Sequence, residues 1–174
     1  MTASVPGPAP SGLGKWLVAG TIGVVAMIGL AWAGTRGPAK LAAVTSGYLE
    51  ANARKPGVVV SPSGIQVEVL EAGDGGDSPV AGDFVLVHYE GRLTDGTVFD
   101  SSLARGTPAA FNVDQVIPGF AEALKGMKRG AKHRVTIPPE LAYGAEGAGD
   151  GVIPPNAVLV FEVQLLEFAS GNGG

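Results

Sequence analysis

The stretch FVLVHYEGRLTDGTVFDSS, residues 84–102, decides the fold class of this chain. Its first ten residues, Phe84 to Leu93, are rich in β-branched and aromatic side chains, which is typical of a strand. The pair Asp95-Gly96 follows and favours a tight hairpin turn, because glycine readily adopts a positive φ. Residues 98–100 then resume the strand pattern, so the stretch predicts two antiparallel strands.

The segments around this hairpin extend the same pattern. Residues 65–69 (IQVEV) alternate between apolar and polar side chains, as a strand with one buried face does. Further strands are expected over 131–137 and 157–168. One short helix is expected over 118–125, beginning at a proline and ending before a glycine. We therefore assign the chain to the α+β class, with an antiparallel sheet and one short helix.

A charge-free apolar segment, residues 16–35 (WLVAGTIGVVAMIGLAWAGT), precedes this domain. As a helix it would span about 30 Å, the thickness of the hydrocarbon core of a bilayer. Trp16 and Trp32 suit the two headgroup boundaries, so the segment is expected to be a transmembrane anchor. A cleaved signal peptide is the alternative, because Ala31-Trp32-Ala33 fits a cleavage site. Residues 1–15 are expected to be disordered, because they cannot build a core.

Residues 36–57 are interpreted as a linker helix between the apolar segment and the domain. Leu41, Val44, Tyr48 and Ala51 recur at spacings of three and four, which marks one face of a helix. This stripe is compatible with a plain spacer helix. The alternative is a homodimer formed through residues 39–55.

Charge and composition exclude several classes of function. The chain has a net charge of −4, and residues 58–174 carry 15 acidic residues against 7 basic ones. The acidic domain, expected over 58–169 with a flexible tail at 170–174, argues against nucleic-acid binding. The chain has no Cys, which excludes disulfides and thiolate zinc sites, and its two His do not supply a histidine-rich metal site. No metal and no cofactor are expected.

Apolar side chains in loops are the main functional signal. The sequence has no nucleophile elbow, phosphate-binding loop or zinc-protease helix motif. Residues 115–120 (QVIPGF) and 143–155 (YGAEGAGDGVIPP) instead place aliphatic and aromatic residues in loops. Such residues are exposed to water unless the core or a ligand covers them. The two segments therefore predict an apolar pocket, while Phe111 fits a core position as well as a pocket position.

Five motifs follow in order along the domain: VHYxG at 87–91, DGxxFDSS at 95–102, VIPG at 116–119, AYG at 142–144 and IPPNAxLxF at 153–161. In this order they resemble the FK506-binding (FKBP) peptidyl-prolyl cis-trans isomerases. Residues 54–58 (RKPGV) and 61–66 (SPSGIQ) further resemble bacterial exported, membrane-anchored members of the macrophage-infectivity-potentiator type. The resemblance implies a twisted antiparallel sheet wrapped around one short helix.

The resemblance also implies a site. Phe120 would form the floor under a proline ring, and the Ile117 N–H and the Tyr143 hydroxyl would hold the flanking carbonyl groups. Asp100 would pair with Arg105 or with a tyrosine hydroxyl and polarise the rim, which makes it the fourth catalytic candidate. The residues implied to contact substrate are Tyr89, Phe99, Arg105, Val116, Val152, Ile153 and Phe161.

Three features depart from the usual family pattern. Phe120 stands where many members have Trp, and Ala109 stands where members often have an aromatic side chain. The 145–151 loop is longer by one residue. These departures predict altered drug affinity and sequence preference with an unchanged fold.

The function implied by the resemblance is that of an isomerase (rotamase) that assists protein folding. It would accelerate rotation of X-Pro bonds by binding the transition state in an apolar pocket. A chaperone or peptide-binding module with little turnover is the alternative. The implied partners are X-Pro polypeptides, macrolides such as FK506 or rapamycin, and the membrane. Positive charges after the anchor, counted literally, favour a cytoplasmic domain, whereas the resemblance to exported relatives favours the periplasmic side.

Overall fold

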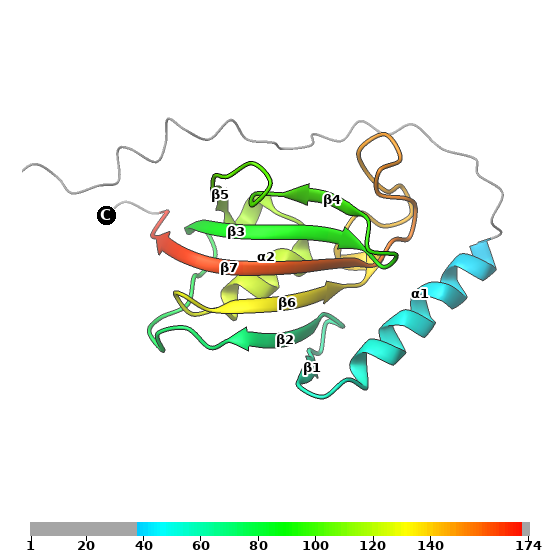
Figure 1. The fold of residues 1–174 in the computed structure, drawn as a ribbon, viewed down its shortest axis with the longest axis horizontal. Helices are drawn as coiled ribbons and strands as arrows, with labels where there is room; N and C mark the ends of the chain where they lie inside the picture. The colour runs from blue at the N-terminus through cyan, green and yellow to red at the C-terminus, as the bar shows by residue number, and fades with distance from the viewer. Residues whose placement is uncertain (1–37, 172–174) are drawn as a thin grey trace, which may run out of the picture.

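An antiparallel sheet organises residues 38–171, the part of the chain that the computed structural model describes (Figure 1). The strands run in the order β1-β2-β6-β7-β3-β4, and β5 pairs with β3 as well. The predicted α+β fold with an antiparallel sheet and a short helix is confirmed. The strands are β1 (Val58–Val60), β2 (Gln66–Glu71), β3 (Phe84–Leu93), β4 (Val98–Ser101), β5 (Ala109–Asn112), β6 (Lys132–Ile137) and β7 (Leu159–Ala169).

Strict alternation along the central strands builds the core. From Val85 to Gly91 in β3 and from Leu159 to Leu165 in β7 every second residue is buried, because successive residues point to opposite faces of a sheet. Tyr89 lies opposite Val163, and Gly91 lies opposite Phe161, so one face of the two strands is shared. The opposite face of β6 and β7 carries charged pairs, of which Arg134 with Glu162 at 2.9 Å is one. The buried side chains of this layer are Val85, Val87, Tyr89, Val135, Ile137, Leu159, Phe161, Val163 and Leu165.

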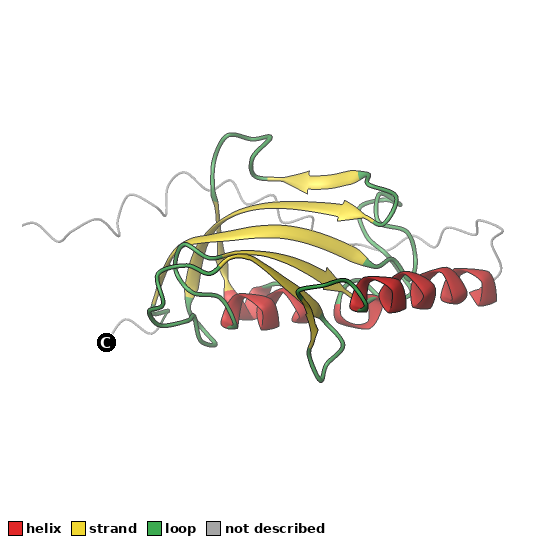
Figure 2. Cartoon of the chain, turned by 60° about the horizontal axis from the view of Figure 1, so that its bottom comes forward, coloured by secondary structure: helices red, strands yellow, loops and turns green. Residues whose placement is uncertain are grey.

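Helix α2 (Pro118–Lys125) covers the concave face of the sheet (Figure 2). Its bounds match the predicted helix, and Phe120, Ala123 and Leu124 are buried against the strands. Gly119 allows the close approach, because an added Cβ would lie 2.4 Å from Cγ2 of Ile137. Two short 3₁₀ helices, η2 (Val113–Gln115) and η3 (Pro139–Leu141), lie in the loops before α2 and after β6. This packing places the beginning of α2 beneath the middle of the sheet.

Helix α1 (Pro38–Ala53) is attached to the domain by polar contacts. The side-chain nitrogen of Asn52 donates hydrogen bonds to Oε1 of Gln66 at 2.8 Å and to Oγ1 of Thr136 at 3.2 Å. The amide of Gln66 in turn donates to the carbonyl oxygen of Leu49 at 2.9 Å. Thr45 donates to the carbonyl oxygen of Asn156 at 3.1 Å, so the helix touches the domain at two places.

The apolar stripe proposed from the sequence is not the face by which α1 docks. Val44 is 59% exposed, Ala51 is exposed, and the docking residues Thr45 and Asn52 occupy other positions on the helix. Apolar periodicity did not reveal this face, because its contacts are hydrogen bonds. The predicted disordered segment at 1–15 and the predicted anchor or signal peptide at 16–35 lie outside the described residues. Among the helices of residues 38–171, none is long and apolar enough to cross a membrane.

His133 is a buried titratable group on the core-facing side of β6. It lies between Val69 of β2 and Val163 of β7 and is 7% exposed. Its Nδ1 has no hydrogen-bond partner within the described part of the chain. Burial disfavours the charged imidazolium and lowers the pKa of His133 below its ordinary 6.5.

Acidification is therefore expected to destabilise the domain through His133. Below pH 6.5 His133 becomes protonated in the unfolded chain. In the folded chain it stays neutral until the pH reaches its lower pKa. The free energy of unfolding therefore decreases as the pH decreases, by at most about 1.4 kcal/mol per pH unit for one proton. Urea titrations between pH 5 and 8 should show a weaker pH dependence for His133→Leu than for the parent chain. His88→Gln is the control, and an equal pH dependence for His133→Leu and the parent would contradict this role.

Candidate functional site

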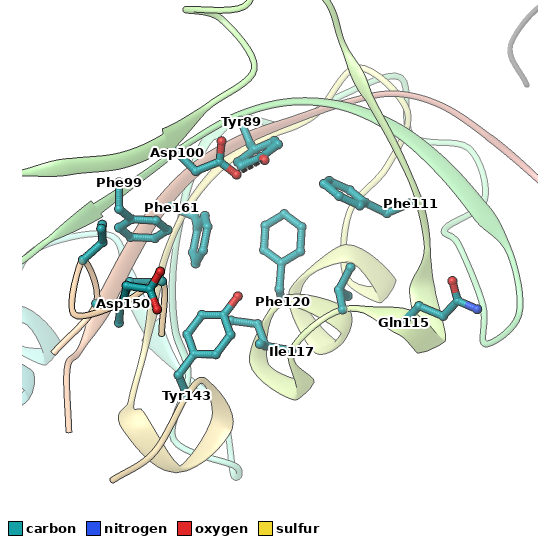
Figure 3. Close-up of a pocket in the computed structure, with 14 residues that line it drawn as sticks. Tyr89, Phe99, Asp100, Phe111, Gln115, Ile117, Phe120, Tyr143, Asp150 and Phe161 are labelled. Carbon is teal, nitrogen blue, oxygen red and sulfur yellow. Dashed lines mark hydrogen bonds between the residues drawn. The ribbon is translucent and has the colours of Figure 1, made fainter. Parts of the chain in front are cut away.

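A pocket of about 640 Å³ opens between the sheet and the beginning of α2 (Figure 3). Its size falls in the range of small-molecule and peptide side-chain sites. Strands β3, β4 and β7, helix α2 and the loop after η3 all contribute side chains. The lining residues are Tyr89, Phe99, Asp100, Phe111, Gln115, Val116, Ile117, Phe120, Tyr143, Gly149, Asp150, Val152, Ile153 and Phe161.

Phe120 forms the floor of this pocket and is held by other aromatic rings. Its ring centroid lies 4.9 Å from that of Phe161 and 6.2 Å from those of Tyr89 and Phe111. These are tilted and edge-on arrangements, the geometries that aromatic rings prefer. Phe120 is only 4% exposed, so its ring is fixed in place by packing on several sides.

A β-bulge places Phe99 and Asp100 in the same pocket. Neighbouring residues of a regular strand point to opposite faces, so only one of the two would be expected there. Asp100 pairs with Gly91, whereas the next pair joins Arg92 to Val98, which leaves Phe99 as an extra residue in β4. A bulge of this kind redirects side chains, and both residues line the pocket.

Gly91 makes room for two of the aromatic walls. A Cβ at this position would lie 2.5 Å from Cζ of Phe99 and 2.8 Å from Cε1 of Phe161. Such distances are far below van der Waals contact. The glycine in β3 is therefore required by the ring positions.

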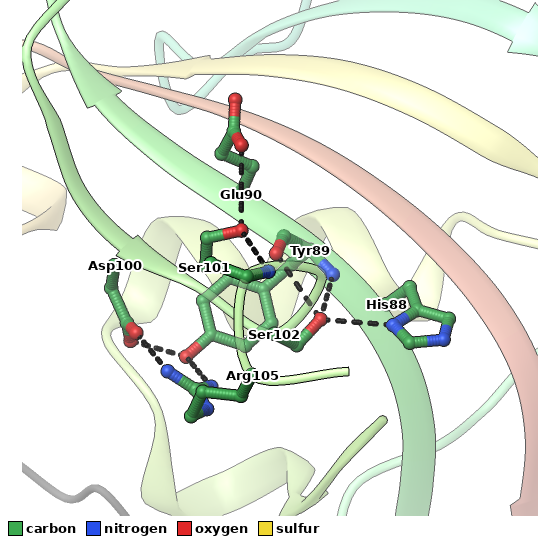
Figure 4. Close-up of polar contacts among 8 residues, drawn as sticks. His88, Tyr89, Glu90, Asp100, Ser101, Ser102 and Arg105 are labelled. Atoms are coloured by element: carbon green, nitrogen blue, oxygen red, sulfur yellow. Dashed lines mark hydrogen bonds and ion pairs between the residues drawn. The ribbon is translucent and has the colours of Figure 1, made fainter. Parts of the chain in front are cut away.

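Asp100, Tyr89 and Arg105 form the polar edge of the site (Figure 4). The carboxylate of Asp100 accepts hydrogen bonds from the Tyr89 hydroxyl and from Nη1 of Arg105. Nη2 of Arg105 also donates to the Tyr89 hydroxyl at 3.2 Å. Burial, together with the hydrogen bond to Asp100, raises the pKa of Tyr89 to about 12. The phenol is therefore protonated at neutral pH and remains a donor to the carboxylate.

Two hydrogen-bond donors at the pocket have no acceptor within residues 38–171. The N–H of Ile117, the residue before α2, is not used by the helix. The hydroxyl of Tyr143 points toward Phe120 across the pocket (Figure 3) and makes no hydrogen bond in that part of the chain. Burial and the negative charge of Asp100 raise the pKa of Tyr143, so it too stays protonated. A bound molecule with two carbonyl groups could satisfy both donors.

Ser102 fixes the loop that follows β4. Its Oγ accepts a hydrogen bond from the Tyr89 N–H at 2.8 Å and lies 3.1 Å from Nδ1 of His88 (Figure 4). The side chain is fully buried, so it acts as a structural anchor for the polar edge.

The pocket brings together every site residue suggested by the sequence except Arg105. The structure places Arg105 beside the pocket and outside its lining, because its guanidinium is engaged by Asp100 and Tyr89. The lining also includes Phe111, which the sequence left open between core and pocket. Gln115, Gly149 and Asp150 line the pocket too and are absent from the sequence-based set. Gln115 directly precedes the VIPG motif, but nothing in the local pattern marked it. Within residues 38–171, no group of three or more His, Cys, Asp or Glu side chains could hold a metal ion.

The fold and the pocket define a small α+β domain whose pocket has an aromatic floor and hydrogen-bond donors at its edge. Comparison with known proteins identifies the family. The family model described as FKBP-type peptidyl-prolyl cis-trans isomerase matches residues 75–166. The chain belongs to this family.

Three similar proteins show how far the likeness extends. The FKBP-type 22 kDa peptidyl-prolyl cis-trans isomerase of Escherichia coli (strain K12) is 58% identical over 120 residues, 69% of this chain and 57% of that protein. The outer membrane protein MIP of Legionella longbeachae is 49% identical over 119 residues, 68% of this chain and 50% of that protein. The crystal structure of FkpA from Escherichia coli has a TM-score of 0.72 at 45% identity and covers 76% of this chain and 61% of that chain.

These comparisons confirm the FKBP-like fold and the likeness to Mip-type proteins that the sequence motifs predicted. The chain spans about half the length of the curated relatives it matches. The family model lies within the globular domain described above.

Proposed function

We propose that this domain is a peptidyl-prolyl cis-trans isomerase that accelerates rotation of X-Pro bonds in folding polypeptides. Rotation of a peptide bond has a barrier of about 18–20 kcal/mol, because it breaks amide resonance. No bond is made or broken, so the reaction needs no nucleophile. The observation that carries the proposal is the aromatic floor of Phe120 beside two donors that have no acceptor within residues 38–171.

The apolar pocket would lower the barrier by differential binding. A planar amide carries separated charge on its oxygen and nitrogen, whereas the twisted amide carries less. Transfer from water to the aromatic floor therefore disfavours the planar form relative to the twisted form. With the proline ring over Phe120, the rings of Tyr89 and Phe161 would exclude water from the rotating bond.

The two free donors would orient the substrate. We assign the Ile117 N–H to the carbonyl of the proline itself and the Tyr143 hydroxyl to the carbonyl before the rotating bond. Holding one carbonyl on each side leaves only the bond between them free to turn. Asp100 would act electrostatically at the polar edge, with Arg105 and Tyr89 as positioning residues that hold its carboxylate.

A direct test is the cis-to-trans relaxation of an X-Pro peptide in the presence of the purified chain. We expect relaxation to accelerate in proportion to protein concentration and an apolar prolyl ligand to inhibit it competitively. A chaperone with little turnover is the competing function, and the absence of an aromatic rim at Ala109 favours it. Suppression of aggregation without accelerated relaxation would select the chaperone and reject the isomerase.

We further propose an envelope location for the domain. The relative from Legionella longbeachae is named an outer membrane protein, and the apolar segment at 16–35 is long enough for an anchor. On this proposal the segment is a single-pass anchor, or a cleaved signal peptide, and the domain lies on the periplasmic side. A C-terminal reporter that is active on only one side of the membrane would decide the orientation.

Two binding partners are also proposed. The exposed face of α1 around Val44 supports a homodimer through residues 39–55, and sedimentation of the chain with Val44→Lys tests it. The aromatic floor supports binding of macrolides such as FK506 or rapamycin, which a titration monitored by tyrosine fluorescence would measure.

A further inference from the structure

Residues 148–153 form a small, well-defined hairpin at the mouth of the pocket, which we call the finger. The N–H of Ala148 donates to the carbonyl oxygen of Ile153 at 2.8 Å, and the N–H of Ile153 donates back to Ala148 at 3.0 Å. The N–H of Val152 donates to the carbonyl oxygen of Gly149 at 3.1 Å. Ala148 and Ile153 are both buried, so the two ends of the finger are held in place by packing.

The backbone of the finger directs one charged side chain to the pocket. Gly147, Gly149, Asp150 and Gly151 all have positive φ, and Asp150 is the residue of this run that has a side chain. Asp tolerates the left-handed region better than most residues. Asp150 and Val152 line the pocket. Asp150 lies on the side where Phe99 lies (Figure 3).

Asp150 differs from Asp100 in having no side-chain partner in the described part of the chain. Asp100 forms an ion pair with Arg105 and accepts a hydrogen bond from the Tyr89 hydroxyl. Asp150 makes no salt bridge and no side-chain hydrogen bond with any residue of 38–171. The pocket lining contains no Lys, Arg or His. The mouth therefore carries an uncompensated negative charge on the side of the finger.

Val152 adds an apolar surface next to this charge. Its side chain is 54% exposed although it lines the pocket. Long basic side chains lay their methylene groups on apolar surface and keep the charged end in water. Together, Val152 and Asp150 fit the stem and the charge of a lysine or arginine side chain.

We propose that Asp150 makes this site prefer X-Pro segments in which the residue before the proline is lysine or arginine. The inference rests on the proposed function and names its substrate class. In Figure 3, Tyr143 lies between Asp150 of the finger on one side and Ile117 on the other. With the carbonyl before the rotating bond at Tyr143, the residue that carries it faces the finger. The side chain before the proline then lies beside Asp150.

The test compares peptides with lysine, leucine or glutamate before proline, for the parent chain and for Asp150→Asn. Asparagine also tolerates the left-handed backbone, so the substitution removes the charge and keeps the finger. For the parent, kcat/KM should be higher with lysine than with glutamate. Asp150→Asn should reduce this ratio by about twofold to fivefold, the size of an exposed charge pair. About 1 M NaCl should reduce the ratio of the parent in the same way.

Glu146→Gln is the matched control, because it removes the same charge from the same loop at an exposed residue outside the pocket lining. It should leave the lysine-to-glutamate ratio unchanged. An equal effect of both variants would assign the preference to overall charge and overturn the role of Asp150, as would a ratio unchanged by Asp150→Asn. Failure of the parent to accelerate even the leucine peptide would reject the isomerase. The affinities of the same three peptides, measured by competition, would then decide whether Asp150 selects them.

Discussion

Replacing Phe120 with alanine is expected to lower kcat/KM on an X-Pro peptide by about tenfold or more, which corresponds to about 1.4 kcal/mol of transition-state stabilisation. The substitution removes the surface on which the proline ring would rest. It also opens the floor to water, because Phe120 is the ring that Tyr89, Phe111 and Phe161 surround. Water at the rotating bond would restore the solvation of the planar amide and raise the barrier.

The same substitution is expected to destabilise the fold, because Phe120 is almost fully buried. A buried Phe→Ala change costs about 3–5 kcal/mol. Phe120→Leu is therefore the second variant, since it keeps an apolar floor and most of the volume, and it should lose less activity and stability. Phe84→Ala removes an exposed ring outside the pocket and is the control. Normal turnover by a folded Phe120→Ala protein would contradict the proposal that the proline ring binds over Phe120.

Replacing Asp100 with alanine is expected to lower kcat/KM by about tenfold or more while the fold is kept. Its carboxylate is partly exposed and contributes little to the core, so circular dichroism and the unfolding midpoint should change little. Loss of the carboxylate would release Arg105 and the Tyr89 hydroxyl into the pocket edge. An unpaired guanidinium there would attract water and disturb the apolar wall.

Asp100→Asn separates charge from shape at this position. The amide can still accept a hydrogen bond from Tyr89, but it no longer pairs electrostatically with Arg105. A large loss of kcat/KM in both variants would support an electrostatic role, whereas a loss confined to alanine would support a packing role. Asp77→Asn, in the exposed loop before β3, is the control. Wild-type turnover in both Asp100 variants would overturn the assignment of this residue.

The sequence predicted the chemistry of the site better than its geometry. The VIPG and AYG motifs and the aromatic residues Tyr89, Phe99 and Phe161 all contribute to one pocket. Arg105 is the one predicted site residue that does not line the pocket, because its guanidinium pairs with Asp100. For the finger, the sequence predicted only a longer glycine-rich loop. Its hydrogen-bonded base depends on where Ala148 and Ile153 meet, and no periodicity reports such a contact.

Local patterns were sufficient for most of the elements. The strand from Phe84 to Leu93 and the helix from Pro118 to Lys125 have the bounds that the sequence suggested. Strands β1 and β5 were missed, because three or four residues are too few to display a period. The docking of α1 was missed for another reason, since Asn52 and Gln66 meet through hydrogen bonds between polar side chains.

The main strands, the short helix, the hairpin turn and the apolar character of the pocket could thus be predicted from residues that are neighbours in the chain. The meeting of Tyr89, Phe120 and Phe161 could not, because they come from three elements whose contact depends on packing across the whole sheet. The roles of the bulge at Phe99 and of Gly91 likewise become clear only in the folded structure, where the rings of Phe99 and Phe161 pack against Gly91. A side chain's polarity is a local property, whereas its partners are chosen by the free energy of the entire folded chain.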